Sequence, residues 1–205
     1  GLRDRFERAV GRYEAALAQL DVRDAAAAES NLLEAGRHIR AYERALMQDT
    51  AVAEREQLRT AAETFMAGVH GWPKGGLQAL RQALARADSV SAADVGMRER
   101  ALRAVCIRGE ILSSAPTPPE DEELRRDYQL RLLMDGLGQV ARTDDRDWEA
   151  MVLEWIGIGA VAPDVHEALE LRFKHALANR PASDAAENSF QKHDGRDKRV
   201  RGDTG

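Results

Sequence analysis

Large apolar residues recur three and four positions apart along most of this chain, and this spacing is the feature that most constrains its fold. The first stretch shows it at Leu2, Phe6, Tyr13 and Leu17. Such spacing places side chains on one face of an α-helix, whereas a half-buried strand alternates with a period of two. The pattern continues to about residue 177 and is interrupted mainly by glycine and proline. We therefore predict a chain of successive amphipathic helices.

The composition agrees with the helical spacing. Of the 205 residues, 35 are alanine, while valine, isoleucine and threonine together number only 23. Alanine favours helices most strongly, and β-branched residues are enriched in strands. The sequence therefore predicts an all-α fold.

The N-terminal third predicts a long antiparallel, coiled-coil-like helical arm over residues 1–71. Asp21 or Asp24 is a candidate N-cap for the second helix, and a run of glycines between residues 68 and 76 ends the third. The predicted helices of this arm are residues 2–20, 24–47 and 50–69.

The remainder predicts a compact helical bundle over residues 72–180. Ser91 and Asp94 have the spacing of a capping box, and Pro163 suits the first turn of the last helix. From Pro181 the chain is polar without periodicity, so residues 181–205 are predicted to be a disordered tail. The predicted helices of the bundle are residues 77–87, 91–114, 120–137, 144–157 and 163–177.

The charges are balanced along the chain. Lysine and arginine number 30 against 35 acidic residues, and no segment forms a basic block. Strong electrostatic binding of nucleic acid therefore has little support. No run of 18 apolar residues is present, so we expect no membrane span. The sequence shows no signal peptide. It starts with Gly1 rather than methionine, so we expect a fragment of a longer protein.

Residues suited to catalysis are few and scattered. Cys106 is the single cysteine, which excludes an internal disulfide and fits a cytoplasmic location. It lies among apolar residues, which favours a buried, inert thiol over a nucleophile. His166 and His175 are nine residues apart, so they lack the spacing of a helical metal site. We therefore predict a protein that is not an enzyme and has no metal, no cofactor and no small-molecule substrate.

Trp148 and Trp155 are seven residues apart and therefore share one helix face. Core packing explains this spacing. The alternative is an aromatic anchor for a protein partner, since tryptophan is enriched at the centres of interfaces.

Arginines are densest on two successive predicted helices. They form a candidate phosphate-binding face if these helices pack against each other. The other interpretation is a solvated surface balanced by neighbouring acidic residues. The arginines concerned are Arg98, Arg103, Arg108, Arg125 and Arg126.

Two stretches, residues 101–140 and 148–180, carry a family resemblance. The residues that carry it include Ala101-Leu-Arg-Ala-Val-Cys-Ile-Arg-Gly-Glu-Ile-Leu112, Pro118-Pro-Glu-Asp121, Leu124-Arg-Arg-Asp-Tyr-Gln-Leu130, Leu153-Glu-Trp-Ile156, Leu169 and Arg172-Phe173. In these residues the chain resembles the C-terminal region of a bacterial family named domain of unknown function 349. The resemblance implies long, helical, coiled-coil-rich cytoplasmic proteins with repeated helical modules, and it brings no enzyme activity with it.

A polar stretch within this resemblance, Arg125 to Gln129, is a second candidate binding region. Tyr128 and Gln129 join the two tryptophans as predicted partner-binding residues, although i, i+4 pairing on an exposed helix also explains them. We predict a non-enzymatic helical interaction or scaffold module that binds a protein partner. The alternative is an RNA- or ribosome-associated accessory protein that uses the five arginines.

Overall fold

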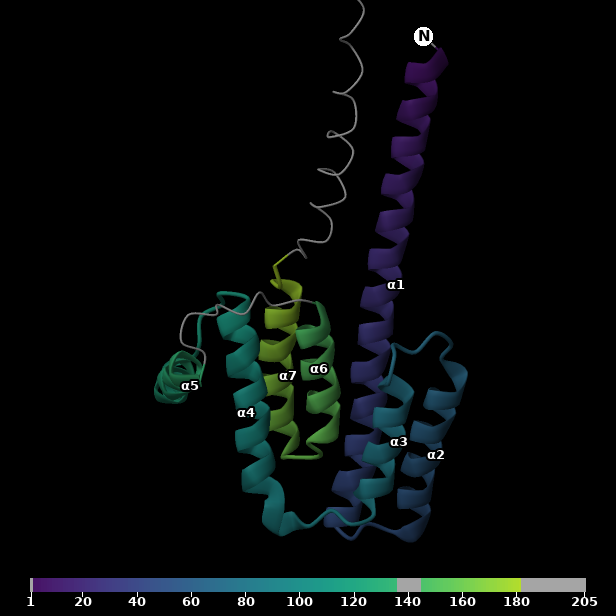
Figure 1. Cartoon of the computed structure of the whole chain (residues 1–205). Helices are drawn as coiled ribbons and strands as arrows, with labels where there is room; N and C mark the ends of the chain where they lie inside the picture. The colour runs from purple at the N-terminus through teal and green to yellow at the C-terminus, as the bar shows by residue number, and fades with distance from the viewer. Residues whose placement is uncertain (1, 136–144, 182–205) are drawn as a thin grey trace, which may run out of the picture.

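The chain folds as an all-α protein, as its apolar spacing and composition predict. A computed structural model describes residues 2–135 and 145–181, and every regular element within these ranges is helical (Figure 1). Two short 3₁₀ turns, η1 (Ala92–Asp94) and η2 (Pro119–Asp121), precede the fourth and fifth helices. The α-helices are α1 (Leu2–Met47), α2 (Val52–Gly68), α3 (Gly76–Ala87), α4 (Val95–Leu112), α5 (Glu122–Asp135), α6 (Asp145–Gly157) and α7 (Pro163–Ala178).

The predicted break between residues 20 and 24 is wrong, because α1 is one continuous helix from Leu2 to Met47. Asp21 and Asp24 lie inside this helix and do not cap a new one. The surrounding sequence contains neither glycine nor proline, and four alanines follow at 25–28. Alanine has the highest helix propensity, and each aspartate costs about 0.7 kcal/mol relative to alanine. The helix therefore continues through them.

α1 and α2 form an antiparallel pair, as predicted for this part of the chain (Figure 1). The turn between them includes Asp49, whose φ of 51° lies in the left-handed region that aspartate tolerates better than most residues. α2 ends at Gly68, where the predicted run of glycines begins. The pairing covers only the C-terminal half of α1, since the N-terminal half extends beyond the other helices in Figure 1.

Glycine is required where the chain turns from α2 into α3. Gly75 has a φ of 79°, which only glycine adopts freely. A Cβ on Gly76 would come within 2.8 Å of the Leu32 Cδ2 atom of α1. The absence of a side chain therefore lets the start of α3 approach α1 closely.

One hydrophobic core crosses the predicted boundary between residues 71 and 72. Its members come from both sides of that boundary, so the C-terminal half of α1 shares a core with the last helices. The Trp155 ring stacks on Phe173 at the centre, with 4.7 Å between ring centroids. The most deeply buried large side chains include Ile39, Leu80, Leu102, Trp155 and Phe173, each 2% exposed or less.

α4 and α7 begin near the residues predicted to start them, and the serine half of the predicted capping box forms. The Ser91 hydroxyl accepts a hydrogen bond from the backbone N–H of Ala93, which stabilises η1 at the entry to α4. Pro163 is the first residue of α7. The predicted disordered tail, residues 181–205, lies outside the described residues except for Pro181.

Candidate protein-interaction surface

Trp148 and Trp155, predicted as partner anchors, lie in the core of this structure. Trp148 is 2% exposed and Trp155 is fully buried. Trp155 stacks on Phe173 of α7, and the Trp148 ring lies close to Gly109 of α4. The seven-residue spacing does correspond to one helix face, but that face packs against α4 and α7. Neither tryptophan presents a surface to a partner here.

Arg98, the first of the five predicted phosphate-binding arginines, supports the fold. Its side chain is 9% exposed. Its Nη1 donates to the carbonyl oxygen of Ala160 at 2.9 Å, and its Nη2 donates to the carbonyl oxygen of Ser91. The guanidinium therefore links the loop before α7 to the turn before α4, and it is not available at the surface.

The next two arginines pair with acidic side chains. Arg103 donates to Glu99 at 2.9 Å and to Asp121 at 3.2 Å. Arg108 forms an ion pair with Glu154 of α6. These pairs neutralise the basic charge locally, so the predicted arginine face does not converge into a phosphate-binding patch.

The polar stretch Arg125–Gln129 is divided between the inside and the outside of α5. Arg125 faces inward, where its Nη1 donates to the Ala115 carbonyl at 2.8 Å and to the Thr117 hydroxyl at 2.7 Å. Tyr128 is half-buried, and burial raises the pKa of its phenol. Gln129, like Arg126, is exposed. Only half of this predicted patch therefore remains accessible.

A polar hollow of about 510 Å³ brings three of the predicted site residues together. Arg125, Arg126 and Gln129 contribute to it from α5, and the loop after α4 forms the opposite wall. One carboxylate, that of Glu122, also faces it. The hollow thus offers guanidinium and amide donors beside a single acid. Its lining residues are Ser114, Ala115, Pro116, Thr117, Glu122, Arg125, Arg126 and Gln129.

A network of buried ion pairs fixes the start of α5 on the rest of the fold. Asp121, 2% exposed, accepts hydrogen bonds from Arg103 and from Arg172 of α7, the latter at 2.6 Å. Arg172 also donates to Glu110 at 2.9 Å, and Glu110 accepts from Thr117 at 2.6 Å. Buried charges that are paired and hydrogen-bonded hold a defined geometry. α5 is therefore held in a defined orientation despite its small apolar contact.

The exposed apolar side chains of α5 form the most concentrated apolar surface on the described residues. Leu130, Leu133 and Met134 are 51%, 68% and 79% exposed. Their i, i+3, i+4 spacing places them on one helix face. We call these three residues the α5 surface. In Figure 1, α5 lies at the outer side of α4 and is seen nearly along its own axis, so it crosses the neighbouring helices.

Arg126 connects the α5 surface to the polar hollow. It precedes Leu130 by four residues, so it lies on the same helix face, and it also lines the hollow. The three apolar side chains of the α5 surface therefore lie beside the guanidinium group of Arg126 and the amide group of Gln129. Exposed apolar clusters with polar rims are typical of protein-binding sites.

The sequence did contain a signal for this surface that the helical spacing alone missed. Leu130, Leu132, Leu133 and Met134 occupy four of five consecutive positions. The buried stripe of a helix takes up roughly three to four positions in every two turns. Four apolar residues within five positions therefore cannot all lie on it, and some of these side chains must face away from the core. The carboxylates that position α5, Glu110 and Asp121, gave no comparable signal, because their arginine partners are distant in sequence.

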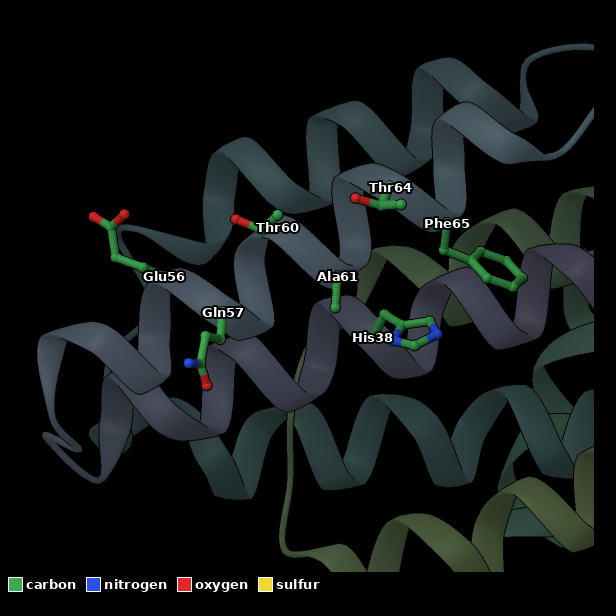
Figure 2. Close-up of a pocket in the computed structure, with 7 residues that line it drawn as sticks. All are labelled: His38, Glu56, Gln57, Thr60, Ala61, Thr64 and Phe65. Carbon is green, nitrogen blue, oxygen red and sulfur yellow. The ribbon is translucent and has the colours of Figure 1, made fainter.

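A second hollow, of about 640 Å³, lies on α1 and α2 (Figure 2). Most of its lining comes from α2, and one end is formed by the His38 ring, whose centroid lies 5.1 Å from that of Phe65. The hollow is open and shallow. It is lined by one imidazole, one carboxylate and two threonines, without a serine or cysteine beside the imidazole. The lining residues are His38, Glu56, Gln57, Thr60, Ala61, Thr64 and Phe65.

The single thiol is inert in this fold. Cys106 is fully buried, and its Sγ donates to the carbonyl oxygen of Leu169 at 3.3 Å. Burial raises the pKa of this thiol to about 12, so the thiolate is scarce at neutral pH. Among the described residues, no group of three or more histidine, cysteine or acidic side chains is arranged to hold a metal ion.

A buried carboxylate on α7 joins that helix to α1. Glu170 is 5% exposed and accepts hydrogen bonds from Arg37 at 2.6 Å and from His166 at 3.1 Å, with Lys174 3.0 Å away. Burial by itself would raise the pKa of Glu170, but the hydrogen bonds from His166, Arg37 and Lys174 outweigh it and hold the pKa well below its usual range. The cluster is saturated by its own cations, so its role is structural.

Comparisons with known proteins return no relatives. No family model, no curated protein and no solved structure matches this chain. In residues 2–135 and 145–181, none of the helices combines the length and the apolar character that crossing a bilayer requires. The resemblance to the domain of unknown function 349 family stays a prediction.

Proposed function

We propose that this chain is a non-enzymatic helical interaction module that binds a protein partner through the α5 surface. The supporting observation is the exposure of Leu130, Leu133 and Met134 on a helix that buried ion pairs hold in place. Binding to a rigid surface avoids the entropic cost of ordering it, which favours affinity. A partner that covers these side chains removes apolar area from water, which stabilises the complex.

The chemistry of the α5 surface defines the kind of partner. Leu130, Leu133 and Met134 form a short apolar row, which suits an apolar stripe on a second helix. Arg126 and Gln129 lie beside this row and favour a carboxylate on the partner. We therefore propose an amphipathic helix with an acidic residue next to its apolar stripe as the ligand. The reduced, buried Cys106 supports a cytoplasmic location for this interaction.

We do not propose that this chain binds RNA. Four of the five arginines predicted for it, Arg98, Arg103, Arg108 and Arg125, have partners within the fold. These four arginines, all among the described residues, are therefore not free to neutralise several phosphates together, and such neutralisation dominates nucleic-acid affinity.

Site-specific photocross-linking in the source cells tests the α5 surface. A benzophenone amino acid replaces Leu133 in one variant and Leu171 in the matched control. Both leucines are exposed, at 68% and 72%, but Leu171 lies alone on α7. We expect a discrete cross-linked protein from position 133 and none from position 171. Equal labelling from both positions, or none from position 133, would contradict the proposal.

Affinity measurements with the captured partner extend the test. Leu133→Glu places a charge in the centre of the contact and should weaken binding at least about 30-fold, as expected for an interface hot spot. Leu171→Glu should leave the dissociation constant within about twofold, because an exposed residue outside the interface contributes little. Similar losses from both variants would show that charge alone, not the α5 surface, controls binding.

A further inference from the structure

The N-terminal half of α1 extends beyond the rest of the fold. Among the α1 side chains that the structure describes, Leu32 is the first in the core, and residues 23–27 are exposed. At 1.5 Å per residue, residues 2–27 span about 39 Å of helix. Figure 1 shows no other helix beside this stretch. Single helices are marginally stable in water and gain stability by packing an apolar face. We therefore expect the extension to pack against a partner helix.

The sequence of this extension follows a heptad repeat with large and small residues in alternation. The first three a positions of the heptad carry large side chains, and the last carries alanine. The two central d positions carry alanine. In heptad notation, the a positions are Phe6, Tyr13, Leu20 and Ala27, and the d positions are Leu2, Ala9, Ala16 and Arg23. A heptad of this kind is the pattern of a coiled coil.

The alternation favours an antiparallel arrangement. In a parallel pair, a positions meet a positions, which would stack Tyr13 on Tyr13 and Ala16 on Ala16 and give layers of unequal width. In an antiparallel pair, each a position meets a d position. Facing large and small residues then interdigitate at a constant helix separation. Layers of this type would join Tyr13 with Ala16, Leu20 with Ala9 and Leu2 with Ala27. The same register places Phe6 against Arg23, the one charged residue at a seam position.

The charges of the extension also favour antiparallel pairing of two identical copies. Residues 3–12 contain four basic and two acidic residues, and residues 14–24 contain one basic and three acidic residues. An antiparallel partner with the same sequence places the basic half of each helix beside the acidic half of the other. The register given by Tyr13 and Ala16 also brings Arg3 opposite Asp24 at the flanking positions, twice by symmetry. Such flanking pairs select partner and orientation.

We propose that two copies of this chain associate through antiparallel pairing of α1 residues 2–27. In this register Leu2 of one copy meets Ala27 of the other, so the seam ends just before Glu29, which pairs with Arg180 of the bundle at 2.8 Å. The pairing therefore covers the extension and stops where the bundle begins. The dimer carries one bundle at each end and two separate α5 surfaces, which makes it bivalent. This inference is independent of the function proposed for α5.

Sedimentation equilibrium of the chain tests the dimer with two matched variants. Ala16→Glu inserts a charge at a seam position, whereas Ala18→Glu makes the same change two residues away at the outer f position. We expect a mass of twice 22.7 kDa for the unchanged chain and for Ala18→Glu. Ala16→Glu should raise the dimer dissociation constant on the order of 100-fold, because it buries two unpaired charges per dimer. Circular dichroism of the buried tryptophans reports that both variants remain folded.

Cross-linking decides the orientation. A short bismaleimide is applied to Ala9→Cys, to Leu20→Cys and to their mixture, with Cys106 protected by burial. Antiparallel pairing brings seam positions 9 and 20 of the two copies together, so only the mixture should cross-link. Cross-linking within Ala9→Cys alone would indicate a parallel pair and overturn the proposal. Dimer formation depends on protomer concentration, so a chain that stays monomeric at a concentration on the order of 100 µM would overturn it as well. A dimer lost in Leu133→Glu but kept in Ala16→Glu would also overturn it.

Discussion

α7 and α5 both pack beside α4, yet only α7 belongs to the core. α7 buries six side chains, including Leu169 and Phe173, whereas every described side chain of α5 is at least partly exposed. The two helices have similar lengths and both contain several leucines. The number of apolar residues therefore does not decide which helix enters the core.

The arrangement of these residues makes the difference. Val165, Leu169, Phe173 and Ala176 are separated by four, four and three positions, which gives one buried stripe. On α5, Leu130, Leu132 and Leu133 point in several directions around the axis. Consequently α7 is fixed by apolar packing, while α5 is fixed by the buried pairs of Asp121 and Glu110 and keeps its apolar residues at the surface. The following predictions test this contrast.

The largest effect is expected from truncating the buried face of α7. Phe173→Ala should lower the free energy of unfolding by about 3–5 kcal/mol, because it leaves a cavity beside Trp155. Leu171→Ala, two residues away and 72% exposed, should change it by less than about 0.5 kcal/mol. Urea unfolding followed by tryptophan fluorescence measures both. Comparable losses would show that the two faces of α7 do not differ as described.

A smaller effect is expected where ion pairs hold α5. Asp121→Ala removes the carboxylate that Arg103 and Arg172 share, and it should cost about 2–3 kcal/mol, less than a fully buried pair because both guanidinium groups are partly exposed. Amide hydrogen exchange should accelerate across α5 and much less across α7. Asp127→Ala on the exposed side of α5 is the control and should leave exchange unchanged. Unaltered exchange in Asp121→Ala would mean that apolar contacts suffice to hold α5.

The pH dependence of the free energy of unfolding should come from two titratable groups on α7, Glu170 and His166. The folded pKa of Glu170 lies below its unfolded value, so its contribution is complete above about pH 4.3 and is lost as the pH falls. The stability difference between the unchanged chain and Glu170→Gln should therefore shrink below that pH, by at most about 1.4 kcal/mol per pH unit. His166, whose pKa is lowered by burial, acts in the same direction at higher pH. A difference that grows on acidification would refute the assignment.

Unfolding curves recorded at several pH values provide this measurement. Glu123→Gln, which removes an exposed carboxylate from α5, controls for general effects of acid on the chain. Its curves should shift in parallel with those of the unchanged chain. A steep pH dependence specific to Glu123→Gln would instead place an important carboxylate on α5.

The smallest effect on stability is expected at the α5 surface. Leu133→Cys should change the free energy of unfolding by less than about 0.5 kcal/mol, since the side chain is 68% exposed. Its new thiol should react within minutes with a thiol reagent, while Cys106 stays unreactive until the chain unfolds. Counting reactive thiols before and after denaturation checks both expectations. Protection of the thiol at 133 in a dilute monomer would place α5 inside the fold.

Much of the helical architecture followed from local sequence. Glycines and prolines marked the ends of α2, α4 and α6 because their backbone restrictions act within a few residues. The predicted break near Asp21 failed since two aspartates do not stop a helix that alanines continue. The candidate site was predicted only in part. Arg126 and Gln129 are accessible, whereas Trp148 and Trp155 are in the core, since helix spacing shows that residues share a face but not what that face contacts.

By itself, the sequence determined the all-α class, most helix boundaries and the absence of a basic block, since propensity, capping and net charge are local or additive properties. Only the tertiary structure decided that the arginines pair internally, that the core crosses residue 71 and that α5 remains outside it. Those outcomes depend on contacts between residues distant along the chain, such as Asp121 with Arg172 and Trp155 with Phe173. Such contacts leave no local pattern, because each partner is an ordinary residue in its own helix.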